Sequence, residues 1–110
     1  MSVNEIYTKD YILQKLKELK PKYENEGLEI LGLIGSYAKD SATKESDIDI
    51  IYQLDAKKFY KLHDGFKCFS RLMDIKGELE KVFDKHVDIC TINQNNEIFK
   101  KYALKDVIYV

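Results

Sequence analysis

Apolar residues recur at helical spacing near the start of the chain. Four of them are three or four residues apart: Ile12, Leu16, Leu19 and Tyr23. This pattern predicts an amphipathic helix from about Thr8 to Lys20, with lysines on its solvent side. Pro21 should break or kink this helix, and Gly27 should close any turn that follows it.

The longest helix is predicted from Phe66 to Phe83. Gly77 lies inside it, although glycine costs about 1 kcal/mol in a helix interior. A set of apolar side chains along this segment is expected to face the core: Phe66, Phe69, Leu72, Met73, Leu79, Val82 and Phe83. A closing helix is predicted from Asn95 to Leu104.

Apolar runs elsewhere are typical of strands. They lie at Leu28–Ile34, Asp47–Leu54, Val87–Ile92 and, as a short final strand, Val107–Val110. A short helix is expected around Tyr37–Ser41. The alternation of helices and strands predicts an α/β or α+β fold with a small mixed sheet flanked by helices. No linker or repeat interrupts the chain, so residues 1–110 are expected to form a single domain.

Composition narrows the class of protein. Apolar residues make up 45% and charged residues 34% of the 110 residues, as in soluble globular domains. The formal net charge of −1 disfavours nucleic acid as the main partner. Cys68 and Cys90 fit neither a disulfide framework nor a zinc site, and are expected to be core residues. With no signal-peptide pattern and no membrane-length apolar run, the protein is expected in the cytoplasm.

Two carboxylates at the start of the second predicted strand carry the first chemical signal. Asp47 and Asp49 are two residues apart, so on a strand their side chains leave the same face. Carboxylates held this close repel each other, and a divalent cation relieves the repulsion. Mg²⁺ is the ion that oxygen ligands suit best.

A second signal precedes these acids. Gly35-Ser36 ends a buried strand and is expected to open a helix, whose backbone N–H groups can cradle phosphate. Asp88, in the third predicted strand, is the candidate for a third carboxylate on the same face. A phosphate cradle beside metal-binding carboxylates is what transfer from a nucleoside triphosphate requires.

The stretch from Gly35 to Ile50, GSYAKDSATKESDIDI, resembles the signature of the DNA polymerase β-like nucleotidyltransferase superfamily. Within it, the chain is similar over nearly its whole length to the minimal nucleotidyltransferases, which are often antitoxins encoded beside a HEPN-domain toxin. The resemblance implies the nucleotidyltransferase fold. It also implies transfer of AMP from ATP to a protein hydroxyl, a tyrosine of the HEPN partner.

The resemblance also implies roles for single residues. Gly35 and Ser36 would hold the triphosphate, while Asp47, Asp49 and Asp88 would be catalytic ligands of two Mg²⁺ ions. Asp88 would favour deprotonation of the acceptor hydroxyl. Lys39 stands where many relatives carry arginine, which keeps the positive charge but loses bidentate phosphate contact. The two histidines, His63 and His86, are interpreted as structural or surface residues.

Two other classes of function remain open from the sequence. In one, the chain is a binding module that neutralises its partner by contact alone. In the other, it transfers a nucleotide to a small molecule or to RNA. The sequence also leaves open a homo-oligomer, the nucleotide base and the acceptor residue.

Overall fold

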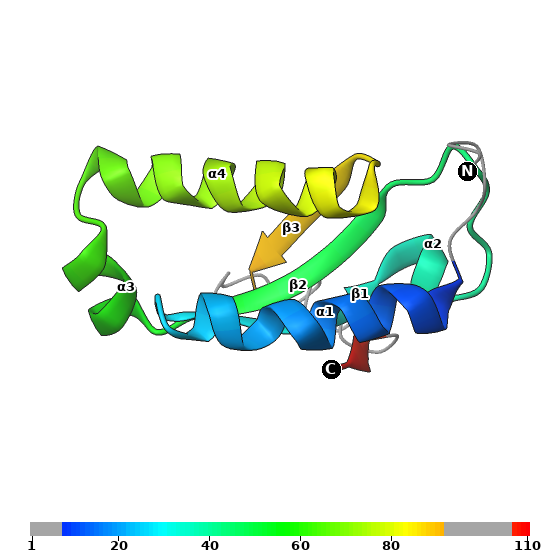
Figure 1. Cartoon of the computed structure of the whole chain (residues 1–110), viewed down its shortest axis with the longest axis horizontal. Coiled ribbons are helices and arrows are strands. Elements are labelled where there is room, and N and C mark those ends of the chain that lie inside the picture. Colours follow the sequence, from blue (N-terminus) through cyan, green and yellow to red (C-terminus); the bar gives the residue numbers. More distant parts are fainter. Residues whose placement is uncertain (1–7, 92–106) are drawn as a thin grey trace.

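The computed structural model describes residues 8–91 and 107–110 and shows a sheet packed against two long helices (Figure 1). In that part of the chain the helices are α1 (Lys9–Glu24), α2 (Gly35–Ala38), α3 (Ala56–Leu62) and α4 (Phe66–Phe83). The strands are β1 (Leu28–Ile34), β2 (Ile48–Leu54), β3 (Val87–Thr91) and β4 (Ile108–Tyr109). The closing helix predicted at Asn95–Leu104 lies outside the described residues, as does Ile92.

The sheet is mixed, as predicted, and its strand order is β3-β2-β1-β4. β1 pairs antiparallel with β2 and with β4, whereas β2 and β3 are parallel. The end of β1 therefore lies beside the starts of β2 and β3. We refer to this end of the sheet as the carboxylate end, because Asp47, Asp49 and Asp88 lie there.

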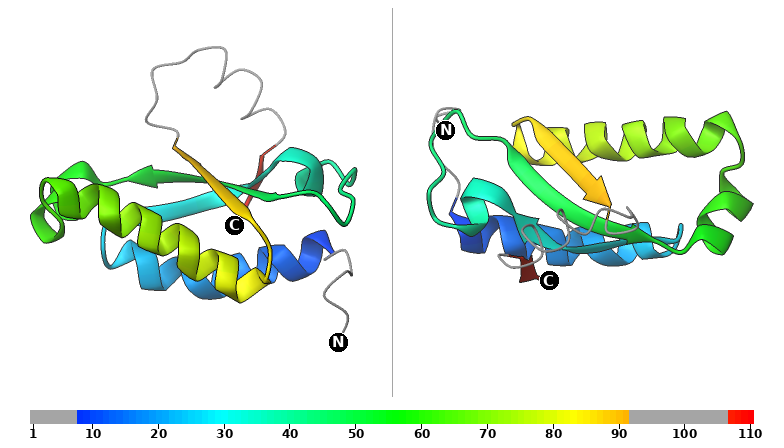
Figure 2. Two further views of the ribbon diagram at one scale, coloured as in Figure 1. Left: turned by 90° about the horizontal axis from the view of Figure 1, so that it is seen from above. Right: turned by 180° about the vertical axis from the view of Figure 1, so that it is seen from behind.

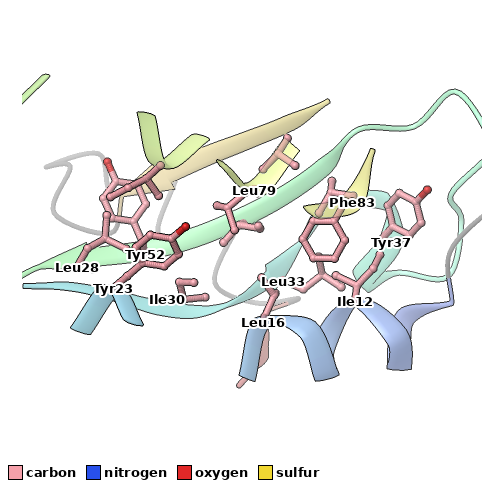
Figure 3. Packing of buried hydrophobic residues seen from close by; sticks show 14 of the residues in the cluster. Ile12, Leu16, Tyr23, Leu28, Ile30, Leu33, Tyr37, Tyr52, Leu79 and Phe83 are labelled. Carbon is pink, nitrogen blue, oxygen red and sulfur yellow. The ribbon is translucent and has the colours of Figure 1, made fainter. Parts of the chain in front are cut away.

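The hydrophobic core lies between the sheet and the two long helices. α1 and α4 cover the same face of the sheet, as the view from above shows (Figure 2). Buried side chains from both helices and from β1 meet there, among them Leu16, Ile30, Leu79 and Phe83 (Figure 3). Ile50 of β2 is buried in the same cluster. Each such side chain contributes roughly 1.5–3 kcal/mol on burial, so this layer positions the strands that carry the acids.

Pro21 does not end α1, so the predicted end at Lys20 is wrong. The helix continues to Glu24, and the N–H of Asn25 still donates to the carbonyl of Pro21 at 3.4 Å. Tyr23, in this last turn, is 1% exposed. Burial of that ring offsets the hydrogen bond that proline removes. Gly27 then closes the turn at φ +94°, as expected.

The bounds predicted for α4 are confirmed, but the predicted inward face is only half right. Leu79 and Phe83 are buried together with Ile75, one helical turn earlier. Several residues predicted to be buried are instead exposed: Phe66 by 93%, Phe69 by 65%, Met73 by 45% and Val82 by 38%. The segment holds two apolar stripes, and a helix packed on a sheet can turn only one of them inward.

Two short helices differ from the sequence-based expectation. α3 was not predicted, because only Phe59 of its residues is buried and seven residues give little periodicity. Its N-cap is Asp55, whose side chain accepts from the N–H of Lys58 at 3.3 Å. α2 spans Gly35–Ala38 rather than Tyr37–Ser41. Within the described ranges, no helix is both long enough and apolar enough to cross a membrane.

Candidate active site

Asp49 and Asp88 are paired across the two parallel strands. Their Cα atoms are register partners of β2 and β3, so both side chains leave the same face of the sheet. Asp47 lies just before β2, which begins one residue later than predicted, and its charge acts on Asp49. Burial raises the pKa of Asp49, and the negative charges of Asp88 and Asp47 raise it further. Asp47 and Asp88, both expected from the sequence, are therefore close enough to Asp49 to influence its charge.

A positive charge borders this group on one side. The Nζ atom of Lys76, on α4, lies 4.0 Å from Oδ1 of Asp88. The Asp88 side chain is 57% exposed and the Lys76 side chain 35% exposed, so solvent screens the pair strongly. No sequence pattern predicted that Lys76 lies near Asp88, because only the fold brings α4 and β3 together.

The three acids are neighbours without forming a closed ligand set. Across residues 8–91 and 107–110, no three carboxylate, imidazole or thiol groups are gathered tightly enough to hold one metal ion. Burial is the main cause of the raised pKa of Asp49, and repulsion by the charges of Asp88 and Asp47 adds to it. The donor set consists of carboxylate oxygens, which suit hard divalent cations.

Gly35 connects the turn after β1 to these acids. Its φ is +79°, in the left-handed region that favours glycine. A Cβ at this position would run into Oδ2 of Asp49. Because Ile34 is the register partner of Asp49, the backbone of the turn lies directly against that carboxylate.

α2 is a single turn that begins at Gly35. The first N–H groups of a helix have no acceptor within that helix, so the backbone at Ser36 can donate to an anion. The carbonyl of Ser36 accepts from the N–H of Ser41 at 2.9 Å, and the N–H of Lys39 donates to the carbonyl of Gly35 at 3.1 Å. One turn has only a small dipole, so the predicted cradle depends on its individual N–H groups.

Lysines from two distant segments hold the loop between α2 and β2. Lys9 of α1 forms a 3.0 Å ion pair with Asp40, which has a left-handed φ of 57°. Lys85, just before β3, donates to the carbonyl of Lys44 at 3.0 Å. These contacts fix the approach of the chain to Asp47. Neither lysine could be singled out from the sequence, since each partner is more than thirty residues away.

Cys90 departs from the expectation that both cysteines belong to the core. Cys68 packs against the core, whereas Cys90 is two residues from Asp88 and shares its face. Burial raises the pKa of the Cys90 thiol, and the charges of Asp49 and Asp88 raise it further. Cys90 is thus a half-buried neighbour of the acids.

Comparison with known proteins identifies the family of the chain. The family described as Polymerase beta, Nucleotidyltransferase matches residues 14–110. A protein of Methanocaldococcus jannaschii, provisionally named a protein adenylyltransferase, is 36% identical over 90% of this chain and 91% of its own length. A second protein of that organism with the same provisional name is 30% identical, and the match covers 93% of each chain.

A solved structure gives the same fold. It is described, provisionally, as a minimal nucleotidyltransferase, and superposes with a TM-score of 0.70 over 94% of this chain and 97% of its own. At 17% identity this likeness bears on the fold alone. Members of the matched family generally use a nucleoside triphosphate and a divalent metal. The family match and the relatives together show that the chain belongs to the polymerase β-like nucleotidyltransferases.

Proposed function

We propose that this chain is a Mg²⁺-dependent protein adenylyltransferase that transfers AMP from ATP to a hydroxyl of a partner protein. The observation that carries this proposal is the pairing of Asp49 with Asp88 while Gly35 lies against Asp49. This arrangement joins a glycine turn that opens a helix to a group of carboxylates, as transfer from a nucleoside triphosphate requires. The provisional names of the two relatives favour a protein as the acceptor.

In this proposal the acids are the metal ligands. Asp47, Asp49 and Asp88 offer the oxygen donors that Mg²⁺ prefers, and their mutual repulsion gives a cation a reason to bind. Two Mg²⁺ ions, when bound, supply Lewis acidity to the transferring phosphoryl group. Asp49 is partly buried, and the charges of both other acids act on it. Its substitution should therefore reduce metal binding and transfer more than substitution of either other acid.

The turn after β1 is the proposed triphosphate site. Gly35 lets the phosphates approach the backbone closely, and Ser36 contributes a hydroxyl and its N–H. Lys39, exposed at the end of α2, adds positive charge toward the pyrophosphate. The acceptor oxygen bonds to the α-phosphorus while the bond to pyrophosphate breaks. Asp88 favours departure of the hydroxyl proton.

The proposed acceptor is a tyrosine of a HEPN-domain toxin, which the chain would silence as its antitoxin in the cytoplasm. The resemblance to minimal nucleotidyltransferases of toxin–antitoxin pairs motivates this choice. The chain has 110 residues and a net charge of −1. So small a domain has little room for its own acceptor-binding part, and the charge disfavours RNA.

Asp49→Asn tests the proposal. The substitution is nearly isosteric, so the fold and the partner surface should survive while metal binding falls. Loss of a shared metal ligand should slow transfer about 100-fold or more. We expect mass spectrometry to show AMP on the HEPN partner with the native chain and ATP–Mg²⁺, and none with the variant. Growth rescue should fail in parallel.

Glu45→Gln is the matched control. Glu45 is exposed in the loop at the same end of the molecule, and its substitution removes one negative charge, as Asp49→Asn does. Transfer should stay within a few-fold of the native rate. A variant Asp49→Asn that leaves the partner unmodified yet rescues growth fully would refute the enzymatic role and favour neutralisation by contact.

A further inference from the structure

Four residues lie in a line along α4, three of them exposed and Gly77 half-buried. Phe66, Ser70, Met73 and Gly77 are spaced by four, three and four residues, so they lie in one line along the helix. Phe66 is 93% and Met73 45% exposed, and Ser70 is also exposed. We call these four residues the α4 stripe. Large and small side chains alternate along it.

Gly77 has no explanation within one copy of the chain. Glycine is among the least favourable residues in a helix interior, and α4 runs through it without interruption. Its φ is not in the left-handed region. Among the residues that the structure describes, a Cβ built at this position would have no atom within 4 Å beyond its chain neighbours and the nearby backbone of its own helix. A glycine with open space on an exposed stripe suits the close approach of another chain.

We propose that two copies of this chain pair through antiparallel α4 stripes. Reversing the order of the stripe places each large side chain on a small one. Phe66 then lies over Gly77 of the second copy, and Met73 over Ser70 of the second copy. The two-fold axis repeats both contacts, as an isologous interface requires.

The charges beside the stripe suit the same pairing. Lys67 and Asp74 are both exposed and lie two turns apart on one flank of the stripe. In an antiparallel pair related by a two-fold axis, this flank faces its own copy. Lys67 then lies within about a turn of Asp74 of the second copy, and the reverse contact follows by symmetry.

The exposed apolar area is of the size that such an interface needs. Phe66, Phe69 and Met73 together expose about 400 Å² of side chain, given their exposed fractions and roughly 200 Å² for a large apolar side chain. A standard interface takes ~800 Å² from each partner, of which roughly 57% is apolar, so these three side chains supply most of that apolar share.

The pairing keeps both carboxylate ends free. α4 ends at Phe83, just before β3 and Asp88. With the centre of the stripe near residues 71–72, the two helix ends lie about 35 Å apart along the helix direction, at 1.5 Å per residue. Each copy would therefore meet its nucleotide and acceptor independently of the other.

Gly77→Leu separates pairing from folding. Leucine is a better helix former than glycine, so the diluted variant should melt at a higher temperature than the native chain. The same side chain fills the space for Phe66 of the second copy. Sedimentation over a micromolar concentration series should show twice the mass of one chain for the native protein, and at least tenfold weaker association for the variant.

Val82→Ser is the matched control. Val82 is 38% exposed on α4, but it lies nine residues from Met73 and hence on the opposite side of the helix. It should leave association unchanged. A native chain that stays monomeric throughout the series would overturn the proposal. So would a dimer that Gly77→Leu leaves intact.

Charge reversal tests the antiparallel register. Lys67→Asp should weaken association several-fold, because the new carboxylate would face Asp74 of the second copy. Lys67→Asp combined with Asp74→Lys should restore it. Failure of the double variant to recover association, while both variants remain folded by circular dichroism, would contradict this register.

Discussion

Gly35 combines two requirements at a single position. Its backbone is left-handed, and the space that a side chain would fill is taken by the Asp49 carboxylate. Any other residue would strain the turn and displace an acid at the same time. The contact therefore couples the turn that receives phosphate to the strand that carries the proposed metal ligands.

Gly35→Ala should lower both stability and transfer. A left-handed alanine costs about 1–2 kcal/mol, and its Cβ would push Asp49 from its position beside Asp88. We expect a clear drop in the denaturation midpoint and a transfer rate at least tenfold below the native rate. Gly77→Ala is the control: its helical, open position should raise the stability of the diluted protein by about 0.5–1 kcal/mol. Equal effects of the two substitutions would contradict this account of Gly35.

Some residues of the candidate site could be predicted from the sequence, and others could not. Gly35, Asp47 and Asp49 were predictable because a strand end, a turn and a two-residue spacing are local patterns. Asp88 required the further guess that its strand lies next to β2. Lys76 and Lys85 could not be found, because their partners become neighbours only through the crossover between β2 and β3.

At the scale of elements, one ion-pair cluster fastens α4 to α1. The guanidinium of Arg71 donates two bonds to Glu26, at 2.6 and 2.7 Å, and one to Glu78 at 2.8 Å. Glu78 also accepts from the hydroxyl of Tyr23 at 2.8 Å, and His63 lies 3.0 Å from Glu26. This Arg71 cluster lies near the C-terminal end of α1, away from the carboxylate end.

The Arg71 cluster changes the acidity of its carboxylates. Hydrogen bonds from Arg71 hold the pKa of Glu26 below its ordinary value. Burial alone would raise the pKa of Glu78, but hydrogen bonds from Arg71 and Tyr23 outweigh it and lower the pKa. Acids with a lowered folded-state pKa stabilise the fold above their ordinary pKa of 4.5. That stability is lost as the pH falls through their lower folded-state values.

Arg71→Met should therefore flatten the acid limb of the stability curve. At neutral pH the variant should lose about 1–3 kcal/mol, because two partly buried carboxylates lose their charged donor. Below pH 4.5 its unfolding free energy should fall less steeply than that of the native chain. Urea titrations at several pH values measure both effects. Lys15→Met, which removes an exposed pair with Glu18 at 3.6 Å, should change stability by less than about 0.5 kcal/mol. A variant curve parallel to the native one would refute the role of the cluster.

Element bounds followed from the sequence better than element orientation did. The bounds of β1 and α4 were predicted without error, since each is a long apolar pattern with clear ends. The inward face of α4 was not, because the Ile75–Leu79–Phe83 stripe competes with the α4 stripe, and Arg71 must also reach Glu26, after the end of α1. Propensity alone placed the end of α1 at Lys20, before Pro21, whereas burial of Tyr23 extends the helix to Glu24.

At the scale of the whole molecule, Mg²⁺ binding at the proposed site should raise the free energy of unfolding. Mg²⁺ that binds only the folded chain stabilises it, by about 2.7 kcal/mol at a hundred times its Kd. Thermal melts should shift upward by several degrees with millimolar Mg²⁺ and ATP, relative to KCl at equal ionic strength. Asp47→Asn should remove the shift.

Without Mg²⁺, the same substitution should stabilise the protein instead of removing a stabilising effect. Asp49 has a raised pKa in the folded chain. The stability that its protonated form provides is therefore lost as the pH rises from its ordinary value of 3.8 through the folded-state value. Removing a neighbouring charge with Asp47→Asn should raise the metal-free melting temperature at neutral pH. No response of the native chain to Mg²⁺ and ATP would count against a metal site at the carboxylate end.

The strand order also determines the order in which the strands can pair during folding. β1 and β2 are neighbours along the chain and can pair through a short connection, which brings Gly35 beside Asp49. Asp88 can join them only after residues 55–86 have crossed over the sheet, because parallel strands cannot be linked directly. Closing that longer loop costs more entropy and is expected later in folding. A chain halted before that step would hold the phosphate turn and two acids without the third, so catalytic competence would report the last stage of folding.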